Sequence, residues 1–383
     1  MKILILTTCE YNKDLRINPF EFDQALSLSG LGNDVRIFAH DFRSIKHLRK
    51  IGYGFSNIKG IKVYYASFFV GRLLPFSLRT FISRIIINNF FKLIQKQNWV
   101  PEVIHSHFID TSFLYNKIIN RLKRDLNFRY IITEHSSKLN ALRLKKTIKK
   151  LTSSAYDGSD YIISVSNSLK NNLLINSKIN SIVIPNMLPI ELENFKIRKI
   201  PSKEFSFVIT ANLVPIKNHY FLFEAFSLFL EKYNAKLFVF GDGILRKKLK
   251  KKCNYLNITD KVIFMGKRQR TFIFDFYNYC DCFILPSLKE TFGVSIIEAM
   301  ACGLPILSSH SGGAEDIIIN PKLGLFFDFK LCDLVEKMEF VFNNIDQFDP
   351  FYIREFVLEK YSASKIAPIL FNLYSKDYKC GNN

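Results

Sequence analysis

The sequence lacks the features of several common protein classes. No window of 18 or more residues is both strongly apolar and free of charge, so we expect no transmembrane helix. The first residues, MKILILTTCE, have an apolar run too short for a signal peptide, and no small-residue cleavage site follows them. Low-complexity blocks and long tracts of like charge are also absent, which argues against a disordered chain. We therefore expect a folded cytoplasmic protein, either soluble or peripheral at the inner face of the cell membrane.

Cysteine is too scattered to suggest a disulfide framework or a metal site. The seven cysteines are Cys9, Cys253, Cys280, Cys282, Cys302, Cys332 and Cys380. No CxxC pair and no Cys/His ligand spacing occurs among them, and no DxD-like acidic cluster follows a predicted strand. We expect buried thiols in a reducing compartment and no bound metal.

Acidic residues are few relative to basic ones. Lys and Arg number 54 against 34 Asp and Glu, which gives a formal net charge of +20. Such an excess attracts phosphates, nucleic acid or anionic lipid, although general richness in Lys, Asn, Ile and Phe is an alternative explanation. The basic residues are dispersed and no nucleic-acid motif occurs, so we expect no nucleic-acid partner.

Short apolar runs alternate with helix-period segments through most of the 383 residues, a length that favours two domains. Runs apolar on both faces predict parallel sheets covered by helices, that is, two doubly wound α/β domains. The predicted strands are Ile3–Leu6, Val35–Phe38, Ile61–Tyr65, Val103–His105, Tyr130–Thr133, Tyr161–Val165, Ile182–Ile184, Phe205–Ile209, Leu237–Phe240, Val262–Met265, Cys282–Leu285 and Ile306–Ser308.

A charged stretch with a proline, Glu191–Lys203, separates the two halves and is interpreted as a linker. We predict domains at 1–195 and 196–360. A C-terminal helix and tail at 361–383 would follow, packing back on the N-terminal domain. Ligands of open parallel sheets bind at the carboxyl ends of the strands, so the chemistry is expected in loops directly after strands, facing a central cleft.

One such loop contains two glutamates beside a glycine, in the sequence KETFGVSIIE. Gly293 is expected to begin a helix, which places Glu290 in the loop and Glu298 inside the helix. The amides near Phe292, Gly293 and Val294 would then face an anion at the helix N-terminus. An alternative without a ligand is equally open: Glu290 caps the helix and Glu298 is a satisfied polar residue.

The run ETFGVSIIEAMACGLP (Glu290–Pro305) and the following Ser311-Gly312-Gly313 resemble the signature of glycosyltransferase family 4, the retaining GT-B enzymes also called glycosyl transferases group 1. Further agreement lies in PEVIHSHF, ITEHS, SDYIISVSNS, FGDG and Gly266. The resemblance implies a GT-B fold of two Rossmann-like domains, an N-terminal one for the acceptor and a C-terminal one for the nucleotide sugar.

The resemblance also assigns roles to residues of the C-terminal half. It implies that Glu298 binds the ribose hydroxyls of the donor, that Glu290 contacts the transferred sugar, and that Lys217 contacts the diphosphate. Members usually have an arginine five residues before this lysine, whereas this chain has Asn212. The candidates to replace that arginine are Lys267, Arg268 and Arg270.

In the N-terminal half, the resemblance places His107 near the transferred sugar and the reacting centre. His135 and Glu134 follow a predicted strand and are expected on the acceptor side. The loop TTCEYNKDLRINP lacks the two glycines common in the family, and it would shape the acceptor side through Arg16 or Lys13.

The function that follows is sugar transfer from a UDP- or GDP-sugar to a hydroxyl of a glycan or lipid-linked oligosaccharide. No cofactor and no metal are expected, and the biological setting that the resemblance implies is cell-surface polysaccharide synthesis of the lipopolysaccharide or capsule type. The alternative is a GT-B-fold sugar-nucleotide epimerase, which would act on UDP-sugar without an acceptor.

Basic and aromatic residues interleave in residues 68–99, whose second part has a helical period. Two interpretations stay open. The segment is either a core-facing helix with a solvated basic edge or an interfacial surface that meets an anionic membrane.

Overall fold

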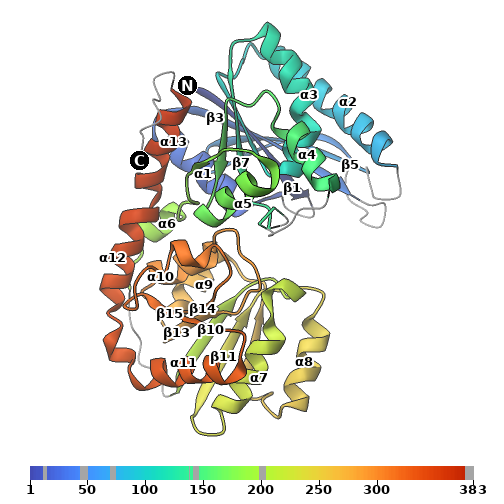
Figure 1. The fold of residues 1–383 in the computed structure, drawn as a ribbon. Coiled ribbons are helices and arrows are strands. Elements are labelled where there is room, and N and C mark those ends of the chain that lie inside the picture. The colour runs from blue at the N-terminus through green and yellow to red at the C-terminus, as the bar shows by residue number, and fades with distance from the viewer. Residues whose placement is uncertain are drawn as a thin grey trace. The chain divides into compact units, whose positions relative to one another are not determined.

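The computed structural model describes residues 1–11, 15–43, 51–69, 75–137, 139–140, 146–197 and 204–375, and it divides into two compact units (Figure 1). The first unit comprises Met1–Met187 and Ala363–Asn383, and the second comprises Leu188–Ser362. The first unit thus ends before residue 195, the predicted boundary. The reason is that Leu188 donates a hydrogen bond to the Tyr361 carbonyl (2.7 Å), and Arg354 donates to the carbonyls of Leu192 and Glu193 (2.8 and 3.0 Å).

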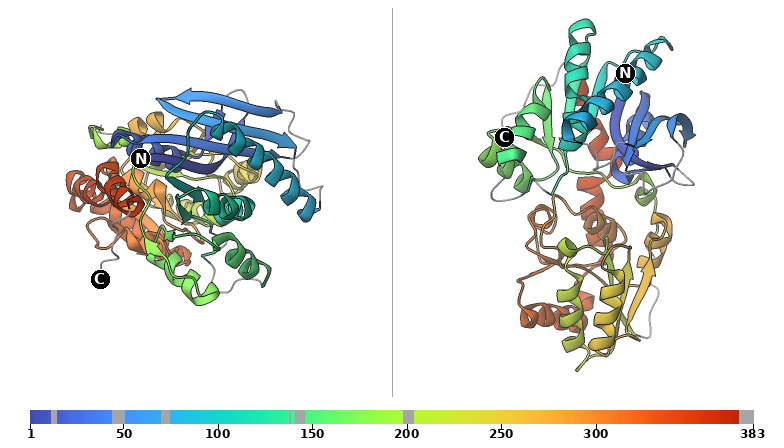
Figure 2. Two further views of the ribbon diagram at one scale, coloured as in Figure 1. Left: turned by 90° about the horizontal axis from the view of Figure 1, so that it is seen from above. Right: turned by 90° about the vertical axis from the view of Figure 1, so that its right-hand side faces the viewer.

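The first unit is a mainly parallel sheet with helices on its faces, and its strand order is β4-β5-β3-β1-β6-β7-β8-β9 (Figure 2). Its strands are β1 (Lys2–Tyr11), β2 (Leu15–Ile17), β3 (Asp34–Arg43), β4 (Gly52–Ile58), β5 (Ile61–Phe69), β6 (Val103–His107), β7 (Arg129–Glu134), β8 (Tyr161–Ser164) and β9 (Ile182–Val183). Its helices are α1 (Pro19–Gly30), α2 (Phe76–Gln95), α3 (Ile109–Asp125), α4 (Lys146–Tyr156), α5 (Asn167–Ser177) and α13 (Ala363–Tyr374).

Two strands of this sheet were not predicted, and both are antiparallel. β4 pairs with β5, and β2 pairs with β1. The sequence of β4, GYGFSNI, alternates between half-buried and exposed residues and contains two glycines, so it lacks the continuous apolar run of the parallel strands.

The second unit is a six-stranded sheet in the order β12-β11-β10-β13-β14-β15, with all pairs parallel. This is the doubly wound order, in which the direction of winding reverses between β10 and β13. Its strands are β10 (Phe205–Thr210), β11 (Ala235–Phe240), β12 (Val262–Gly266), β13 (Cys282–Leu285), β14 (Ile306–Ser309) and β15 (Gly324–Phe327). Its α-helices are α6 (Ile190–Glu193), α7 (His219–Phe229), α8 (Arg246–Tyr255), α9 (Arg270–Tyr277), α10 (Val294–Ala301), α11 (Leu331–Asn343) and α12 (Pro350–Tyr361), and its short 3-10 helices are η1 (Pro215–Lys217), η2 (Ala314–Asp316) and η3 (Ile345–Gln347).

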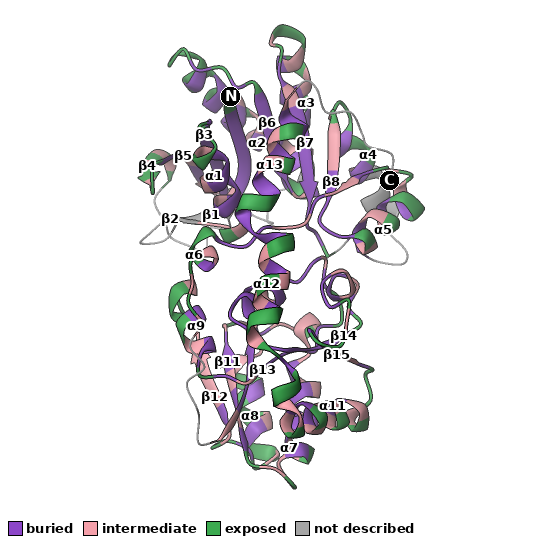
Figure 3. Ribbon diagram, turned by 90° about the vertical axis from the view of Figure 1, so that its left-hand side faces the viewer, coloured by how far each residue is buried: buried purple, intermediate pink, exposed green. Residues whose placement is uncertain are grey.

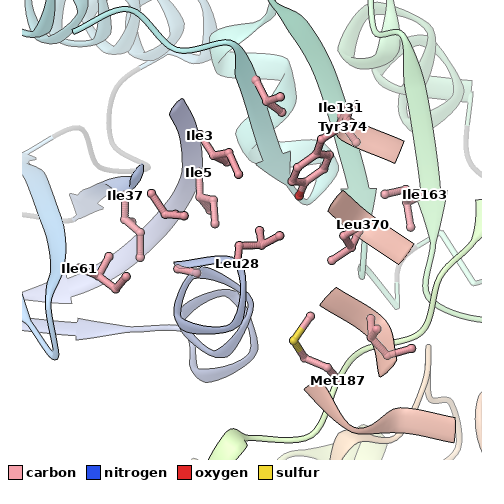
Figure 4. Packing of buried hydrophobic residues seen from close by; sticks show 14 of the residues in the cluster. Ile3, Ile5, Leu28, Ile37, Ile61, Ile131, Ile163, Met187, Leu370 and Tyr374 are labelled. Atoms are coloured by element: carbon pink, nitrogen blue, oxygen red, sulfur yellow. The ribbon is translucent and has the colours of Figure 1, made fainter. Parts of the chain in front are cut away.

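Within each unit the strands are mostly buried and the outer faces of the helices are exposed (Figure 3). The core of the first unit includes the C-terminal helix α13, which packs against α1. Figure 4 shows Leu370 and Tyr374 of α13 beside Ile131 and Ile163 of the sheet, with which they form one apolar cluster. Residues 363–374 are therefore part of the first unit's core although 188–362 separate them from it along the chain.

Cys9, Cys253, Cys280, Cys282 and Cys302 are buried as free thiols, whereas Cys332 is exposed, contrary to the expectation for that residue. Among the described residues, no helix combines the length and the apolar character needed to cross a bilayer.

Candidate functional site

The loop between β13 and α10 in the second unit has the geometry that the sequence predicted. Gly293 is the N-cap of α10 and has a φ of +106°, a backbone conformation that side chains strongly disfavour. A Cβ there would also lie 3.0 Å from Cδ1 of Ile296. The first amides of α10, including that of Val294, have no acceptor within the helix, so the helix N-terminus favours an anion.

This loop is fixed by close contact with the loop after β14. A Cβ at Gly313 would lie 2.5 Å from the amide nitrogen of Phe292, and the Glu290 amide donates to the Ser311 carbonyl (2.9 Å). The Phe292 ring is buried and packs edge-on against Tyr361, with ring centroids 5.5 Å apart. The Phe292 ring is therefore part of the packing of this unit and is not open to solvent.

Glu290 forms an ion pair with Lys217, which lies at the end of η1. The two loops are also joined through the backbone, because the Leu288 amide donates to the Ile216 carbonyl (2.8 Å). The side chains are 11% exposed for Glu290 and 21% for Lys217, so the pair is partly shielded from water and keeps its charges together beside α10.

Glu298 forms a second ion pair, with Arg270 at the start of α9. The Arg270 Nε donates to Glu298 Oε1 at 3.0 Å, and its Nη2 donates to the same oxygen. Lys267 is exposed, and the Arg268 Nε donates to the Met265 carbonyl (3.0 Å). Of the three basic residues proposed to replace the missing arginine, Arg270 is thus the one for which the structure records a bond to Glu298.

The position of Asn212 is set by backbone contacts among the loops that follow β10, β11 and β12. Asn212 is exposed, and its carbonyl accepts a hydrogen bond from the Val214 amide (2.9 Å). The Gly241 amide donates to the carbonyl of Gly266 (2.9 Å), whose φ of +70° suits a glycine. The Gly241-Asp242-Gly243 segment is therefore a turn packed against its neighbours, since a Cβ at Gly243 would lie 2.5 Å from the Leu213 carbonyl oxygen.

His219 of α7 is a buried residue to which the sequence assigned no role. Burial, together with the smaller effect of the nearby Lys217 charge, lowers its pKa to about 4. Neither ring nitrogen has a hydrogen-bond partner among the described residues. The residue was missed because one histidine inside an apolar helix pattern is normally structural.

In the first unit, His105, His107 and His135 form a stack at the ends of β6 and β7. The ring centroids of His105 and His107 are 4.4 Å apart, and those of His107 and His135 are 5.2 Å apart. Nδ1 of His107 and Nε2 of His135 lie 3.0 Å apart and share a hydrogen bond. Burial lowers the pKa of all three residues, that of His107 to about 3, so the stack is neutral at pH 7.

His105 is bonded on both ring nitrogens. Its Nδ1 lies 2.5 Å from the Tyr374 hydroxyl and 2.9 Å from Nε2 of Gln24, and its Nε2 lies 2.7 Å from Oγ1 of Thr133. Because the Gln24 amide nitrogen donates to Nδ1, the His105 proton belongs on Nε2. Helix α13 thus contacts the histidine stack directly.

His107 is fully buried, and its Nε2 has no hydrogen-bond partner among the described residues. His135 is 8% exposed, and its ring lies 4.6 Å from that of Phe20. The structure therefore places both predicted histidines together, but neither is an open side chain in the first unit.

Glu134 is fully buried beside this stack. Its Oε1 accepts hydrogen bonds from the amides of His135 (2.9 Å) and Ser136 (2.6 Å), and its Oε2 accepts one from the Tyr156 hydroxyl (2.6 Å). Burial raises the pKa of Glu134 to about 7 despite these bonds. The Arg16 side chain and all of Lys13 lie outside the described residues.

The part of the chain that the structure describes contains no group of three or more His, Cys, Asp or Glu placed to hold a metal ion.

Two family descriptions match consecutive parts of the chain. Residues 22–192 match "Glycosyltransferase Family 4", and residues 191–347 match "Glycosyl transferases group 1". The matches together extend over both units.

Individual relatives are similar at lower coverage. An uncharacterized glycosyltransferase of Methanocaldococcus jannaschii is 32% identical over 63% of this chain and 66% of its own length. The capsular polysaccharide biosynthesis glycosyltransferase CapM of Staphylococcus aureus is 27% identical over 48% of this chain and 52% of its own length. The matched segments cover only 40% to 66% of three M. jannaschii relatives.

Among solved structures, HepE of Anabaena in complex with UDP-glucose has a TM-score of 0.73 at 15% identity, covering 97% of this chain and 99% of HepE. At this identity the likeness supports the fold, a GT-B arrangement of two α/β domains.

Proposed function

Because the chain belongs to the glycosyl transferases group 1 of family 4, whose fold is GT-B, we propose that it transfers a sugar from a nucleotide-diphosphate sugar to a hydroxyl acceptor with retention at the anomeric carbon. The observation that carries the proposal is in the second unit. Glu290 and Glu298 lie before and within α10, each paired with a cation, and the N-terminus of this helix begins between them at Gly293.

In the proposed complex the donor diphosphate occupies the N-terminus of α10. Glu298 accepts hydrogen bonds from the ribose hydroxyls, and Glu290 accepts them from the sugar. Lys217 stabilises the negative charge that grows on the departing diphosphate, which is the type of interaction that lowers a barrier most effectively.

The bond changes occur on one face of the sugar. The bond from the anomeric carbon to the diphosphate oxygen breaks through an oxocarbenium-like transition state, and the acceptor oxygen bonds to the same face. The acceptor proton passes to the leaving phosphate oxygen. This route requires no enzyme nucleophile, metal or cofactor, and it depends on positioning.

We further propose that Arg270 supplies the cation that Asn212 cannot. Its guanidinium holds the carboxylate of Glu298 through two nitrogens, which orients that carboxylate before the ribose binds. Gly266 ends the strand that precedes α9, where it allows the backbone to approach the donor.

The acceptor, a glycan or lipid-linked oligosaccharide, would bind the first unit near His107, His135, Glu134 and Arg16. The imidazoles of His107 and His135 are buried and neutral, so they would border this site without adding charge. Similarity to CapM supports a role in cell-surface polysaccharide synthesis of the capsule or lipopolysaccharide type. We place the enzyme in the cytoplasm, peripheral to an anionic membrane that holds such acceptors.

The decisive experiment is donor binding by Glu298→Ala. UDP-, GDP- and ADP-sugars are screened for thermal stabilisation of the wild type, since a ligand bound to the native state raises the unfolding temperature by mass action. We expect the best donor to lose at least about 100-fold in affinity, equal to about 2.7 kcal/mol, with Glu298→Ala. Glu355→Ala, an exposed change on α12, should bind normally.

Unchanged donor affinity in a folded Glu298→Ala protein would contradict the assignment. Formation of an epimer from UDP-sugar alone, with no acceptor present, would instead identify a sugar-nucleotide epimerase.

A further inference from the structure

One face of α2 in the first unit is exposed, apolar and basic. Leu78, Phe81 and Ile85 recur at helical spacing and are 43%, 61% and 47% exposed, and Leu93 follows on the same face. The neighbouring exposed positions include lysines at 92 and 96. A helix that faces water normally presents polar residues of both charge signs there, whereas α2 contains no acidic residue.

The edge strand β4 extends this surface. Ile51, Tyr53 and Phe55 are about half exposed. The Tyr53 hydroxyl donates a hydrogen bond to the Ile86 carbonyl of α2 (2.9 Å), so strand and helix present their apolar side chains as one surface. We call it the α2–β4 surface; it comprises residues 51–55 and the exposed face of α2 given above.

A pocket of about 390 Å³ opens in the α2–β4 surface, a size within the range of small-molecule sites, roughly 300–1,000 Å³. Its lining residues are Tyr53, Gly54, Phe55, Tyr64, Tyr65, Asn89, Phe90, Leu93 and Gln97. Most of this wall is aromatic or aliphatic.

Two polar side chains of the pocket wall, those of Tyr64 and Gln97, are already bonded to one another. The Tyr64 hydroxyl donates to Oε1 of Gln97 (2.9 Å), and Nη1 of Arg36 donates to the same oxygen (3.2 Å). A sugar would need free donors and acceptors, whereas a hydrocarbon chain needs only apolar walls. The pocket therefore suits a hydrocarbon.

The chain segment that supplies all of the pocket wall carries charge of one sign in the sequence. Residues 42–101 include eleven basic residues and no Asp or Glu. Five of these side chains lie in the part of the chain that the structure describes: Lys59, Lys62, Lys92 and Lys96 are exposed, and Arg84 is half-buried. Basic side chains beside exposed Phe, Leu and Ile are the combination by which helices bind an anionic membrane in its interfacial plane.

We propose that the α2–β4 surface binds an anionic phospholipid membrane and that its pocket takes one acyl chain of a phospholipid. The inference rests on the proposed peripheral localisation and goes further by naming the surface, the lipid charge and the site of the chain. The lipid tail of an acceptor, another protein and a second copy of this chain are the competing occupants.

A tryptophan in the pocket wall tests entry of the acyl chain. The protein has a single tryptophan, Trp99, which is 3% exposed. Phe55→Trp places a reporter in the pocket, and Phe351→Trp places a control on α12, where the native side chain is 68% exposed. With phosphatidylcholine–phosphatidylglycerol vesicles brominated on their acyl chains, we expect Phe55→Trp emission to fall to about half of its value with unbrominated vesicles, and the control to change little.

Equal quenching at both positions, with the protein bound to the vesicles, would refute the pocket's role. If an isoprenoid phosphate, added in an amount equimolar to the protein, displaces the brominated chain and restores the emission, the pocket belongs to the lipid tail of an acceptor. This outcome would also overturn the proposal.

Binding by the surface is tested with a double variant, Phe81→Ser with Ile85→Ser. Each change removes an apolar side chain whose burial contributes roughly a factor of ten in binding, so we expect about 100-fold weaker sedimentation with anionic vesicles. The matched control, Ile244→Ser with Phe351→Ser, changes two residues that are 80% and 68% exposed in the second unit. Wild-type binding should weaken with added salt and be at least tenfold lower on neutral vesicles.

Nucleotide-sugar stabilisation is measured on the same samples. If the double variant loses vesicle binding but is still stabilised by the donor, the result supports the α2–β4 surface as the membrane-binding site. If no nucleotide sugar stabilises the wild type, only the proposed transfer reaction is contradicted. If the double variant still binds vesicles normally, or if it changes only the oligomeric state, the surface does not bind membrane.

Discussion

The two units keep ionisable side chains out of water in opposite ways. In the second unit, the buried carboxylates Glu290 and Glu298 each have a cationic partner, Lys217 and Arg270. In the first unit, His107, His135 and Glu134 are buried among neutral hydrogen-bonding groups. The second unit can therefore hold charge beside its candidate site, whereas the first favours the uncharged forms of its histidines.

This difference matters for how each unit would recognise a ligand. Partly shielded ion pairs can exchange partners when a diphosphate and sugar hydroxyls arrive. Buried neutral imidazoles orient hydrogen bonds but add no charge, because ionising a buried ring carries a desolvation cost. The same contrast predicts that pH acts mainly on the first unit.

The largest expected effect is selective acid unfolding of the first unit. Burial lowers the pKa of His107 to about 3 and that of His40 to about 4, from an ordinary value near 6.5. Between these values the unfolded chain binds more protons, so stability is full above about pH 6.5 and falls as the pH drops. Each histidine should cost about 1.4 kcal/mol per pH unit, or roughly 3 kcal/mol by pH 4.

Hydrogen exchange followed by peptide mass spectrometry checks this expectation unit by unit. Among the described residues, the second unit has one comparable histidine, His219, with a pKa of about 4, and the first unit has four buried histidines. If hydrogen exchange on acidification begins in the second unit, the expectation that the first unit unfolds first is wrong.

The next effect concerns Lys217→Ala, which leaves the Glu290 carboxylate without its cation and removes charge stabilisation from the leaving group. We expect kcat to fall by roughly 10²–10³, since one such stabilising interaction contributes about 3–4 kcal/mol. Steady-state kinetics with the identified donor measure it. Lys217→Arg serves as the comparison, and a Lys217→Ala enzyme with wild-type kcat would remove Lys217 from the mechanism.

Glu134→Gln should remove a pH dependence of the stability whose sign is opposite to that caused by the buried histidines. Burial raises the pKa of Glu134 to about 7 from an ordinary 4.5, so the folded state binds more protons between these values. Stability therefore falls as the pH rises through this window, by about 3 kcal/mol in total. Urea unfolding at pH 5 and pH 8 checks this through the difference between two proteins. Because the buried histidines act equally in both, the stability of Glu134→Gln should rise by about 3 kcal/mol more than that of the wild type over this range. Glutamine keeps an oxygen for the two amides. Identical slopes in both proteins would mean that Glu134 is ionised throughout.

The smallest effect is that of Tyr374→Phe, which deletes the hydroxyl bonded to His105 and Gln24. We expect a loss of about 1–2 kcal/mol in the free energy of unfolding, because the bond is buried. Tyr352→Phe, at a residue 38% exposed with a 3.4 Å hydrogen bond to Asn320, should cost under about 0.5 kcal/mol. Equal losses would show that the α13 contact is no stronger than a surface one.

Much of the fold was predictable because parallel strands carry continuous apolar runs. The β13–Gly293–α10 junction was predictable for a local reason: a glycine at a helix start after a buried strand needs no knowledge of distant residues. β4 was missed because its alternating pattern is weak and its pairing with β5 is what stabilises it.

The partners within the candidate site were less predictable. Arg270 was one of three basic residues in a single loop, and only tertiary packing brings it to Glu298. The histidine stack joins β6 and β7, and its contact with Tyr374 spans 269 positions of sequence. No periodicity within one element encodes such a pairing, because it depends on how separate elements pack.

The discontinuity of the first unit has a consequence for synthesis on the ribosome. Residues 363–374 complete its core but are translated only after 188–362, which takes roughly 10–35 s at about 5–20 residues per second. During that interval the apolar side chains that pack against Leu370 and Tyr374 in the finished protein are not buried by helix α13. We expect ribosome-bound chains halted at residue 340 to be cleaved by protease within residues 1–187 and full-length chains to resist; equal resistance would mean that this unit closes without its last helix.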